Sequence, residues 1–211
     1  MILNLSSNTL LSISIVVAAA CFIYCYRHTT HTTLTGPDGV AYSIMKRENW
    51  TQSNKILGRF AEIRKRVDAL CNYCTQNNYP DYARASRMQQ RWNRSQLQET
   101  RPTDKSVAYV VDKGREFSVC LTNKTTGELE DINSTMFVVL HEMGHLMSVS
   151  WGHNAEFWNN FKLILGQAHK LGIYDYTDYG DKPQEYCGIS IYSNPCPNAT
   201  CKTAKQPLNT K

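Results

Sequence analysis

Residues 141–158 read HEMGHLMSVSWGHNAEFW, and the spacing of the histidines in this stretch is the strongest indication of the fold. His141 and His145 are four positions apart, so a helix places both imidazoles on one face, one turn apart. Two such imidazoles can hold one Zn²⁺ at about 2.0–2.1 Å from each nitrogen. Glu142 follows the first histidine directly, where its carboxylate can reach a water at the metal rather than the metal itself. The stretch therefore predicts a zinc site with an adjacent general base.

A third ligand is expected shortly after this helix. Gly152 permits a sharp turn, and His153 follows it, so the chain can fold back toward the metal. Glu156 and Glu185 are competing candidates, because carboxylates also bind zinc. For Glu156 a different role is favoured, the complementing of the dipole at the start of the next helix. The predicted metal ligands are His141, His145 and His153, and the predicted catalytic residue is Glu142.

The segments around this stretch predict an α+β domain. Apolar periodicity and capping residues predict helices over 54–77, 82–92, 136–147 and 154–172. Residues 106–112 and 115–122 are rich in Val, Tyr and Phe and are separated by Lys113-Gly114, which is typical of a β-hairpin. From Tyr174 onward no period is evident, and an ordered coil is expected.

The N-terminal segment differs from the rest. Residues 10–26 (LLSISIVVAAACFIYCY) carry no charge and predict a membrane-spanning signal-anchor helix. A cleaved signal peptide and a buried core helix are the alternatives, but residues 1–9 lack Lys and Arg and a polar spacer follows the run. Basic residues occur only after the run, which places the main domain on the cytoplasmic side. Five N-x-[ST] triplets in that domain argue for the opposite side and are given less weight.

These features divide the chain into four parts: a membrane anchor at 1–27, a linker at 28–44, the metal-binding domain at 45–192 and a flexible tail at 193–211.

Apolar residues make up 42% of the chain and charged residues 19%, which is the composition of a globular protein with its own core. The net charge of +5 is too small to indicate a dedicated nucleic-acid-binding protein. Binding to nucleic acid is therefore only weakly supported.

The cysteines leave their chemical state open. Cys21 and Cys25 lie in the apolar N-terminal run, and the others are Cys71, Cys74, Cys120, Cys187, Cys196 and Cys201. These six residues fit disulfides in an oxidising compartment and free thiols in a reducing one. The spacing of Cys71 and Cys74 resembles half of a zinc knuckle, but no second such pair follows.

The string from His141 to Trp158 resembles the active-site signature of the WLM/SprT-like zincin peptidases. The matching positions are His141, Glu142, His145, His153, Phe157 and Trp158. Residues 107–192 as a whole are also similar to metallopeptidases of large DNA viruses that carry an N-terminal membrane segment, and the resemblance covers roughly residues 45–192. The resemblance implies a minimal zincin-like fold, one catalytic Zn²⁺ and proteolytic activity. It does not extend to the C-terminal zinc ribbon of SprT proteins, which this chain lacks.

The sequence thus predicts a zinc metalloendopeptidase that hydrolyses peptide bonds, with Glu142 activating water at the zinc. Tyr176, Tyr179, Tyr186 and Tyr192 are candidates for a donor to the oxyanion. One alternative is a membrane-tethered structural or interaction protein in which zinc has no catalytic role. Another is a DNA-associated protein-processing factor. The expected partners are a protein or peptide substrate and a membrane, either cellular or, for a viral protein, that of the virion.

Overall fold

The computed structural model describes residues 7–196 and 200–201, and this part of the chain folds into an α+β domain. The helices are α1 (Ser7–Thr30), α2 (Trp50–Gln76), α3 (Tyr82–Asn93), α4 (Ile132–Met147) and α5 (Ala155–Lys170). The strands are β1 (His31–Thr35), β2 (Ala41–Met45), β3 (Gln96–Glu99), β4 (Ala108–Val111), β5 (Glu116–Val119), β6 (Gln184–Tyr186) and β7 (Ile189–Ile191). The predicted α+β class is confirmed, and the predicted helices of the domain correspond to α2, α3, α4 and α5.

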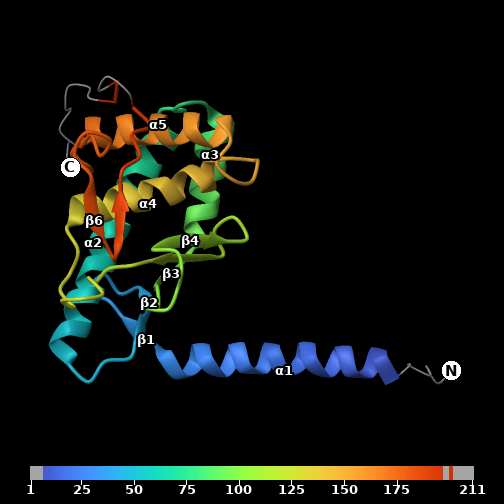
Figure 1. The fold of residues 1–211 in the computed structure, drawn as a ribbon. Helices are drawn as coiled ribbons and strands as arrows, with labels where there is room; N and C mark the ends of the chain where they lie inside the picture. Colours follow the sequence, from blue (N-terminus) through green and yellow to red (C-terminus); the bar gives the residue numbers. More distant parts are fainter. Residues whose placement is uncertain (1–6, 197–199, 202–211) are drawn as a thin grey trace.

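Five strands form a mixed sheet in the order β1-β2-β3-β5-β4 (Figure 1). β3 pairs in parallel with both β2 and β5, whereas β4 and β5 form an antiparallel hairpin in which Val111 lies opposite Glu116. This hairpin is the one predicted from residues 106–122. Because β4 ends the strand order, it forms an edge of the sheet, and it contacts α4.

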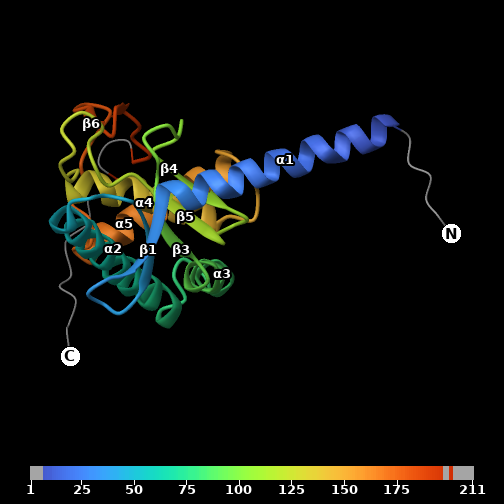
Figure 2. The same ribbon diagram turned by 90° about the horizontal axis from the view of Figure 1, so that it is seen from below.

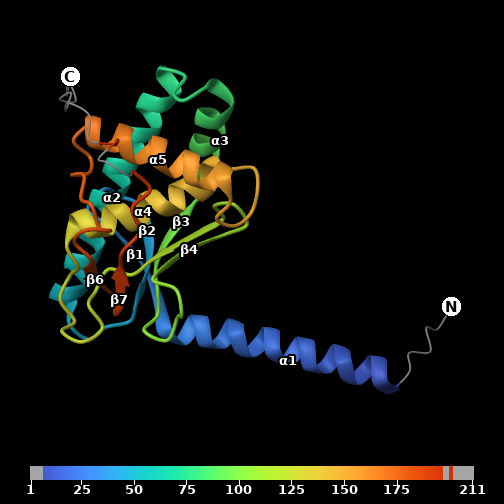
Figure 3. The same cartoon turned by 45° about the horizontal axis from the view of Figure 1, so that its top comes forward.

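Helices α2 to α5 cover one face of the sheet, and α4 lies between the sheet and α5 (Figures 1 and 3). The inward-facing side chains of the strands pack against helix residues. Trp92 of α3 meets Phe117 of β5 edge to face at 5.6 Å between ring centroids, and Tyr42 of β2 stacks on Phe60 of α2. Such aromatic pairs bury large apolar areas and fix the orientation of helix on sheet.

Helix α4 begins at Ile132, four residues before the predicted start, and ends at Met147 as predicted. The side chain of Asp131 is the N-cap and accepts a hydrogen bond from the amide of Ser134 at 2.8 Å. Asn133, in the first turn of α4, exchanges hydrogen bonds with the backbone of Asp175 and so ties α4 to the C-terminal segment. Almost every side chain of α4 is buried, because the helix is enclosed by the sheet, α3 and α5.

Residues 28–44 were expected to be a linker, but most of them belong to the folded domain. β1 and β2 pair over five residues, from His31↔Met45 to Thr35↔Ala41. Tyr42 and Ile44 alternate with exposed positions and are fully buried. A second difference is the β6–β7 hairpin, which lies in the segment expected to be coil. Residues 197–199 and 202–211 of the predicted tail lie outside the described residues.

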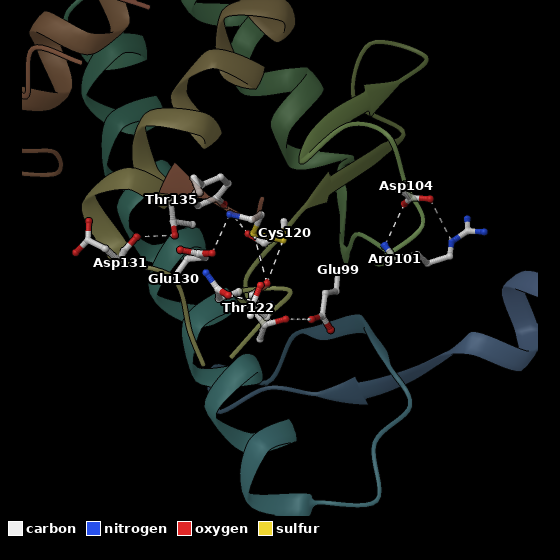
Figure 4. Close-up of a disulfide and its surroundings, with 12 residues drawn as sticks. Glu99, Arg101, Asp104, Cys120, Thr122, Glu130, Asp131 and Thr135 are labelled. Atoms are coloured by element: carbon white, nitrogen blue, oxygen red, sulfur yellow. Dashed lines mark hydrogen bonds and ion pairs between the residues drawn. A yellow bond between two sulfur atoms is a disulfide. The ribbon is translucent and has the colours of Figure 1, made fainter. Parts of the chain in front are cut away.

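Two disulfides resolve the state of four cysteines. Cys120, just after β5, is bonded to Cys187 in the turn between β6 and β7, and Cys196 is bonded to Cys201. Figure 4 shows the surroundings of the first bond, where Glu130 accepts a hydrogen bond from the amide of Cys187. Cys71 and Cys74 are buried free thiols in α2, and burial raises the pKa of both. The chain therefore combines disulfides with free thiols.

The predicted membrane span at residues 10–26 falls on α1, which projects away from the domain (Figure 2). Within the described part of the chain, no helix combines the length and the apolar character needed to cross a membrane. The predicted span is therefore not supported.

Candidate metal centre

The three predicted histidine ligands meet at one point. His141 and His145 come from consecutive turns of α4, and His153 comes from the loop between α4 and α5. The Nε2 atom of His153 lies 2.9 Å from Nε2 of His141 and 3.2 Å from Nε2 of His145. Candidate ligand atoms of all three lie within 4.8 Å of one another. Among the described residues this is the cluster of metal-binding side chains that the structure assembles.

The arrangement fits a zinc ion. Two nitrogens bound tetrahedrally at 2.0–2.1 Å from a common ion are separated by about 3.3 Å. The distances of 2.9 and 3.2 Å between the Nε2 atoms are close to that value. Three imidazole nitrogens are also the donor set of many catalytic zinc sites, which keep a fourth position open. The three histidines could hold Zn²⁺ without a change in the fold.

The electrostatic surroundings keep two of these imidazoles neutral. Burial lowers the pKa of His141 to about 3, and the neighbouring histidines add to this effect. Burial also lowers the pKa of His145 to about 4, with contributions from His153 and the ammonium of Lys113. Because a metal binds only the unprotonated imidazole, both residues are in the binding form at neutral pH.

Glu142 lies beside this cluster in a dry environment. Its exposed fraction is 6%, and burial raises the pKa of its carboxyl to about 8. It nevertheless lines the same cleft as His141 and His153. A carboxylate with few water neighbours is a stronger base than an exposed one, as a group that takes a proton from water needs to be.

The two carboxylates that compete with His153 lie elsewhere. Glu156, in the first turn of α5, accepts hydrogen bonds from the amides of Val149 and Ser150 and from the hydroxyl of Ser150. These bonds lower its pKa to about 2. Glu185 is an exposed residue of β6 and is not part of the histidine cluster. Of the three candidates, the structure brings only His153 to the other two histidines.

Aromatic rings and a glycine set the distance between α4 and α5 at the site. Phe157 stacks on His145 at 4.3 Å between ring centroids, and Phe161 contacts the edge of His141. A Cβ atom on Gly144 would lie 3.1 Å from Phe157 and 3.3 Å from Phe161. Gly144 thus allows α5 to approach the site closely, and the rings shield the imidazoles of His141 and His145 from water.

Two arginines of α3 that the sequence did not identify hold the end of α4. Arg87 donates to the carbonyl of Met147, and Arg91 donates to the carbonyls of Leu146 and Ser148. These carbonyls lack partners within the helix, and cations at a helix C-terminus also complement its dipole. The sequence shows that α3 is basic, but the carbonyl groups that its arginines bind lie more than 50 residues further along the chain.

A cleft with a volume of about 700 Å³ opens onto the cluster. His141 and Glu142 of α4 line it together with His153, and Trp158 of α5 adds an apolar surface. One side is formed by residues 105–108, which lead into the edge strand β4, and another by residues 189–193, which include β7. Figure 3 shows β6 and β7 beside α4. The cleft is thus mainly apolar, with the histidines and Glu142 as its reactive groups.

We expect the metal-free protein to be most stable near pH 6.5. Between about pH 4 and 6.5 the unfolded chain holds more protons on His141 and His145 than the folded chain does, so stability rises with pH. Above about pH 6.5 the folded chain keeps a proton on Glu142 that the unfolded chain has lost, so stability falls toward pH 8. Urea unfolding midpoints in the presence of a chelator measure this profile. A midpoint that still rises between pH 7 and 8 would contradict it.

Comparisons with known proteins give viral relatives. No family model matches the chain. Uncharacterized protein R325 of Acanthamoeba polyphaga mimivirus is 32% identical over 156 residues, which are 72% of this chain and 77% of that protein. Uncharacterized protein 136R of Invertebrate iridescent virus 6 is 33% identical over 99 residues, which are 45% of this chain and 53% of that protein. The expected similarity to viral proteins is confirmed.

Among solved structures, Wss1 from Saccharomyces cerevisiae aligns with a TM-score of 0.44 at 17% identity, covering 59% of this chain and 84% of that one. This likeness is remote, and the resemblance to the WLM/SprT-like peptidases stays a prediction. The relationship to R325 is different, because the identity exceeds 30% and the alignment covers most of both proteins. The chain belongs to the same protein family as R325 of Acanthamoeba polyphaga mimivirus.

Proposed function

We propose that this protein is a zinc-dependent endopeptidase. The observation that carries the proposal is the convergence of three histidine Nε2 atoms beside a cleft that His141, His153 and Glu142 line. The resemblance of residues 141–158 to the WLM/SprT-like signature supports the same reading. A purely structural zinc site is normally closed by four protein ligands, whereas this cluster has three and opens onto a cleft.

The chemistry divides between the ion and the chain. His141, His145 and His153 would hold the zinc, which when bound would supply a Lewis acid for water and for the substrate carbonyl. Glu142 takes a proton from the water as its oxygen bonds to the carbonyl carbon. The same carboxyl then gives that proton to the amide nitrogen as the C–N bond breaks, so that one water is consumed and an acid and an amine are formed. Phe157 and Trp158 limit the access of other water molecules.

The cleft favours an extended polypeptide as substrate. β4 is an edge strand, and the residues that lead into it form one side of the cleft. An edge strand presents unpaired backbone groups, to which an extended peptide can add as a further strand. Apolar side chains such as Phe137, Trp158 and Ile191 would then receive apolar side chains of that peptide. The reacting carbonyl would lie against His141 and Glu142.

The structure distinguishes among the four tyrosines considered as oxyanion donors. The hydroxyl groups of Tyr176, Tyr179 and Tyr186 bind other parts of the protein, namely the carbonyl of Cys196, the hydroxyl of Ser134 and the carbonyl of Cys120. Tyr192 is 74% exposed and lines the cleft. Tyr192 is therefore the phenol able to reach a bound substrate.

Replacing Tyr192 by Phe should lower kcat by about 100-fold and change KM little, because the lost donor acts on charge that develops only in the transition state. Steady-state kinetics on a cleaved peptide measure the effect. Tyr82→Phe is the matched control, since Tyr82 is similarly exposed but lies at the start of α3. Equal kcat values for the Tyr192→Phe variant and the wild type would remove Tyr192 from the reaction.

The proposed function is tested with the full chain and a library of unstructured peptides, with cleavage read by mass spectrometry. Cleavage is expected with Zn²⁺, should stop when a chelator removes the metal, and should return when Zn²⁺ is restored. The Co²⁺-substituted protein supplies a second reading, because the spectrum of an open site changes with pH. Metal binding with a pH-independent spectrum and no cleavage would instead favour a structural zinc protein.

Other sequence-based expectations stay predictions. They concern binding to a membrane or to DNA, and the cytoplasmic or virion location of the domain. The proposed peptidase activity depends on none of them.

A further inference from the structure

The turn between β4 and β5 places a lysine next to the loop that carries His153. Asp112, Lys113 and Gly114 all have positive φ angles, of 47°, 53° and 109°. Three successive residues of this kind curl the turn tightly. Lys113 is 9% exposed, although a lysine in a hairpin turn usually extends into water. Its burial therefore needs a specific reason.

The reason is visible in its contacts. The Nζ atom of Lys113 donates hydrogen bonds to the carbonyl of Ser150 and, at 3.3 Å, to the carbonyl of Ser148. The same ammonium lies 4.5 Å from the centre of the Trp151 ring. A buried ammonium is tolerated only when acceptors replace its water shell, and here all of them come from residues 148–151. Lys113 thus fastens the edge hairpin to this short segment.

That segment controls the position of the third histidine. His141 and His145 are fixed by α4, but His153 lies in an irregular loop, three residues after Ser150. The carboxylate of Glu156 accepts hydrogen bonds from the amides of Val149 and Ser150, and Lys113 donates to the carbonyls of Ser148 and Ser150. The backbone N–H groups of this loop are therefore bound by a negative charge from α5, and its carbonyl groups by a positive charge from the β4–β5 turn.

We propose that Lys113 is a positioning residue that holds the 148–153 loop so that His153 completes the metal site. Lys113 would act through the loop backbone and would touch neither metal nor substrate. Because it belongs to the hairpin whose edge strand β4 borders the cleft, it also links the substrate-binding edge to the third ligand. This inference rests on the proposed metal site.

The test compares metal affinity in three variants. Lys113→Met keeps an unbranched stem at the same φ angle but removes the ammonium, Lys113→Arg keeps a charged donor, and Lys182→Met removes an exposed lysine elsewhere. Zn²⁺ and Co²⁺ affinities are measured by competition with a chromophoric chelator, and urea unfolding is measured on the metal-free proteins. Loss of an outer partner of a metal ligand weakens metal binding by about 10- to 100-fold.

The expected result is a loss of that size for Lys113→Met, with near wild-type affinity for Lys113→Arg and Lys182→Met. The visible spectrum of bound Co²⁺ should change in Lys113→Met as His153 becomes displaced. The Lys113→Met protein could instead be less stable but keep the wild-type metal affinity and Co²⁺ spectrum. That result would overturn the inference, and Lys113 would then only stabilise the packing of the hairpin against the loop. A wild-type chain that binds no metal would instead refute the proposed function.

A second variant covers the case in which Lys113→Met does not fold. Trp151 is exposed, so its replacement by Leu removes the ring beside the ammonium without opening the core. A cation–π contact of this exposed kind is worth about a 2- to 5-fold change in affinity. Trp151→Leu should weaken metal binding by that factor in the wild-type background. An unchanged metal affinity in a folded Trp151→Leu protein would count against the proposed positioning role of Lys113.

Discussion

Replacement of Glu142 by Gln is expected to reduce peptide hydrolysis by about 10²- to 10⁴-fold, the contribution of a positioned general base. Gln has nearly the same size, so the buried site should keep its shape, but its amide cannot accept a proton from water. Metal content should therefore match that of the wild type, and only turnover should fall. The measurement is kcat/KM on a cleaved peptide together with the zinc content of the purified variant.

Glu185→Gln is the matched control for this substitution. It changes the charge in the same way, on an exposed residue of the β6–β7 hairpin near the cleft but outside the histidine cluster. Activity of the Glu185→Gln variant should equal that of the wild type. If the Glu142→Gln variant retained full turnover, Glu142 would not be the base. If the Glu142→Gln variant lost its metal, the role of Glu142 would be to support the metal ligands rather than to accept a proton from water.

Replacement of His153 by Ala is expected to produce the largest loss of metal affinity among residues outside α4. It removes one of three nitrogen donors, so the loss should exceed the roughly 100-fold that follows removal of an outer-shell partner. Chelator competition with Zn²⁺ measures the affinity, and the Co²⁺ spectrum reports the change in ligand set. The rate of peptide hydrolysis should fall in proportion to the fraction of protein that has lost its metal.

Glu156→Gln distinguishes the two residues that compete for the third position. The Glu156 carboxylate receives three hydrogen bonds from Val149 and Ser150, so its replacement should loosen the loop and weaken metal binding by less than the His153→Ala change does. The reverse order, with Glu156→Gln losing the metal and His153→Ala keeping it, would identify Glu156 as the ligand and contradict the geometry described above.

The parts of this site that depend on local spacing were predictable. His141, Glu142 and His145 are fixed by the period of one helix, and that helix is indicated by its cap at Asp131 and its apolar residues. His153 was predictable to the extent that Gly152, with a φ angle of 78°, allows the chain to turn. The sequence favoured His153 over Glu156, and the structure brings only His153 to the other two histidines.

Features that depend on distant partners were not predictable. The Thr-rich residues 31–35 lack a strong strand pattern, and β2 joins the sheet through the pairing of Ser43 with Gln98, 55 positions along the chain. The pairing of Cys120 with Cys187 and the contacts of Arg91 and Lys113 likewise join segments that only the tertiary fold brings together. A basic residue in a helix or turn is usually solvated, and no local signal marks these as exceptions.

The Cys120–Cys187 bond has a consequence for what happens when the backbone of this chain is cut. The bond closes a covalent ring that contains α4, the His153 loop and α5, and thus all three histidines and Glu142. A nick in the backbone anywhere inside the ring, including one made by another copy of the same protein, leaves the two fragments joined. The nicked chain would migrate as one species on a non-reducing gel and separate only after reduction. The bond therefore keeps His141, Glu142, His145 and His153 within one covalently connected molecule after a single backbone cut.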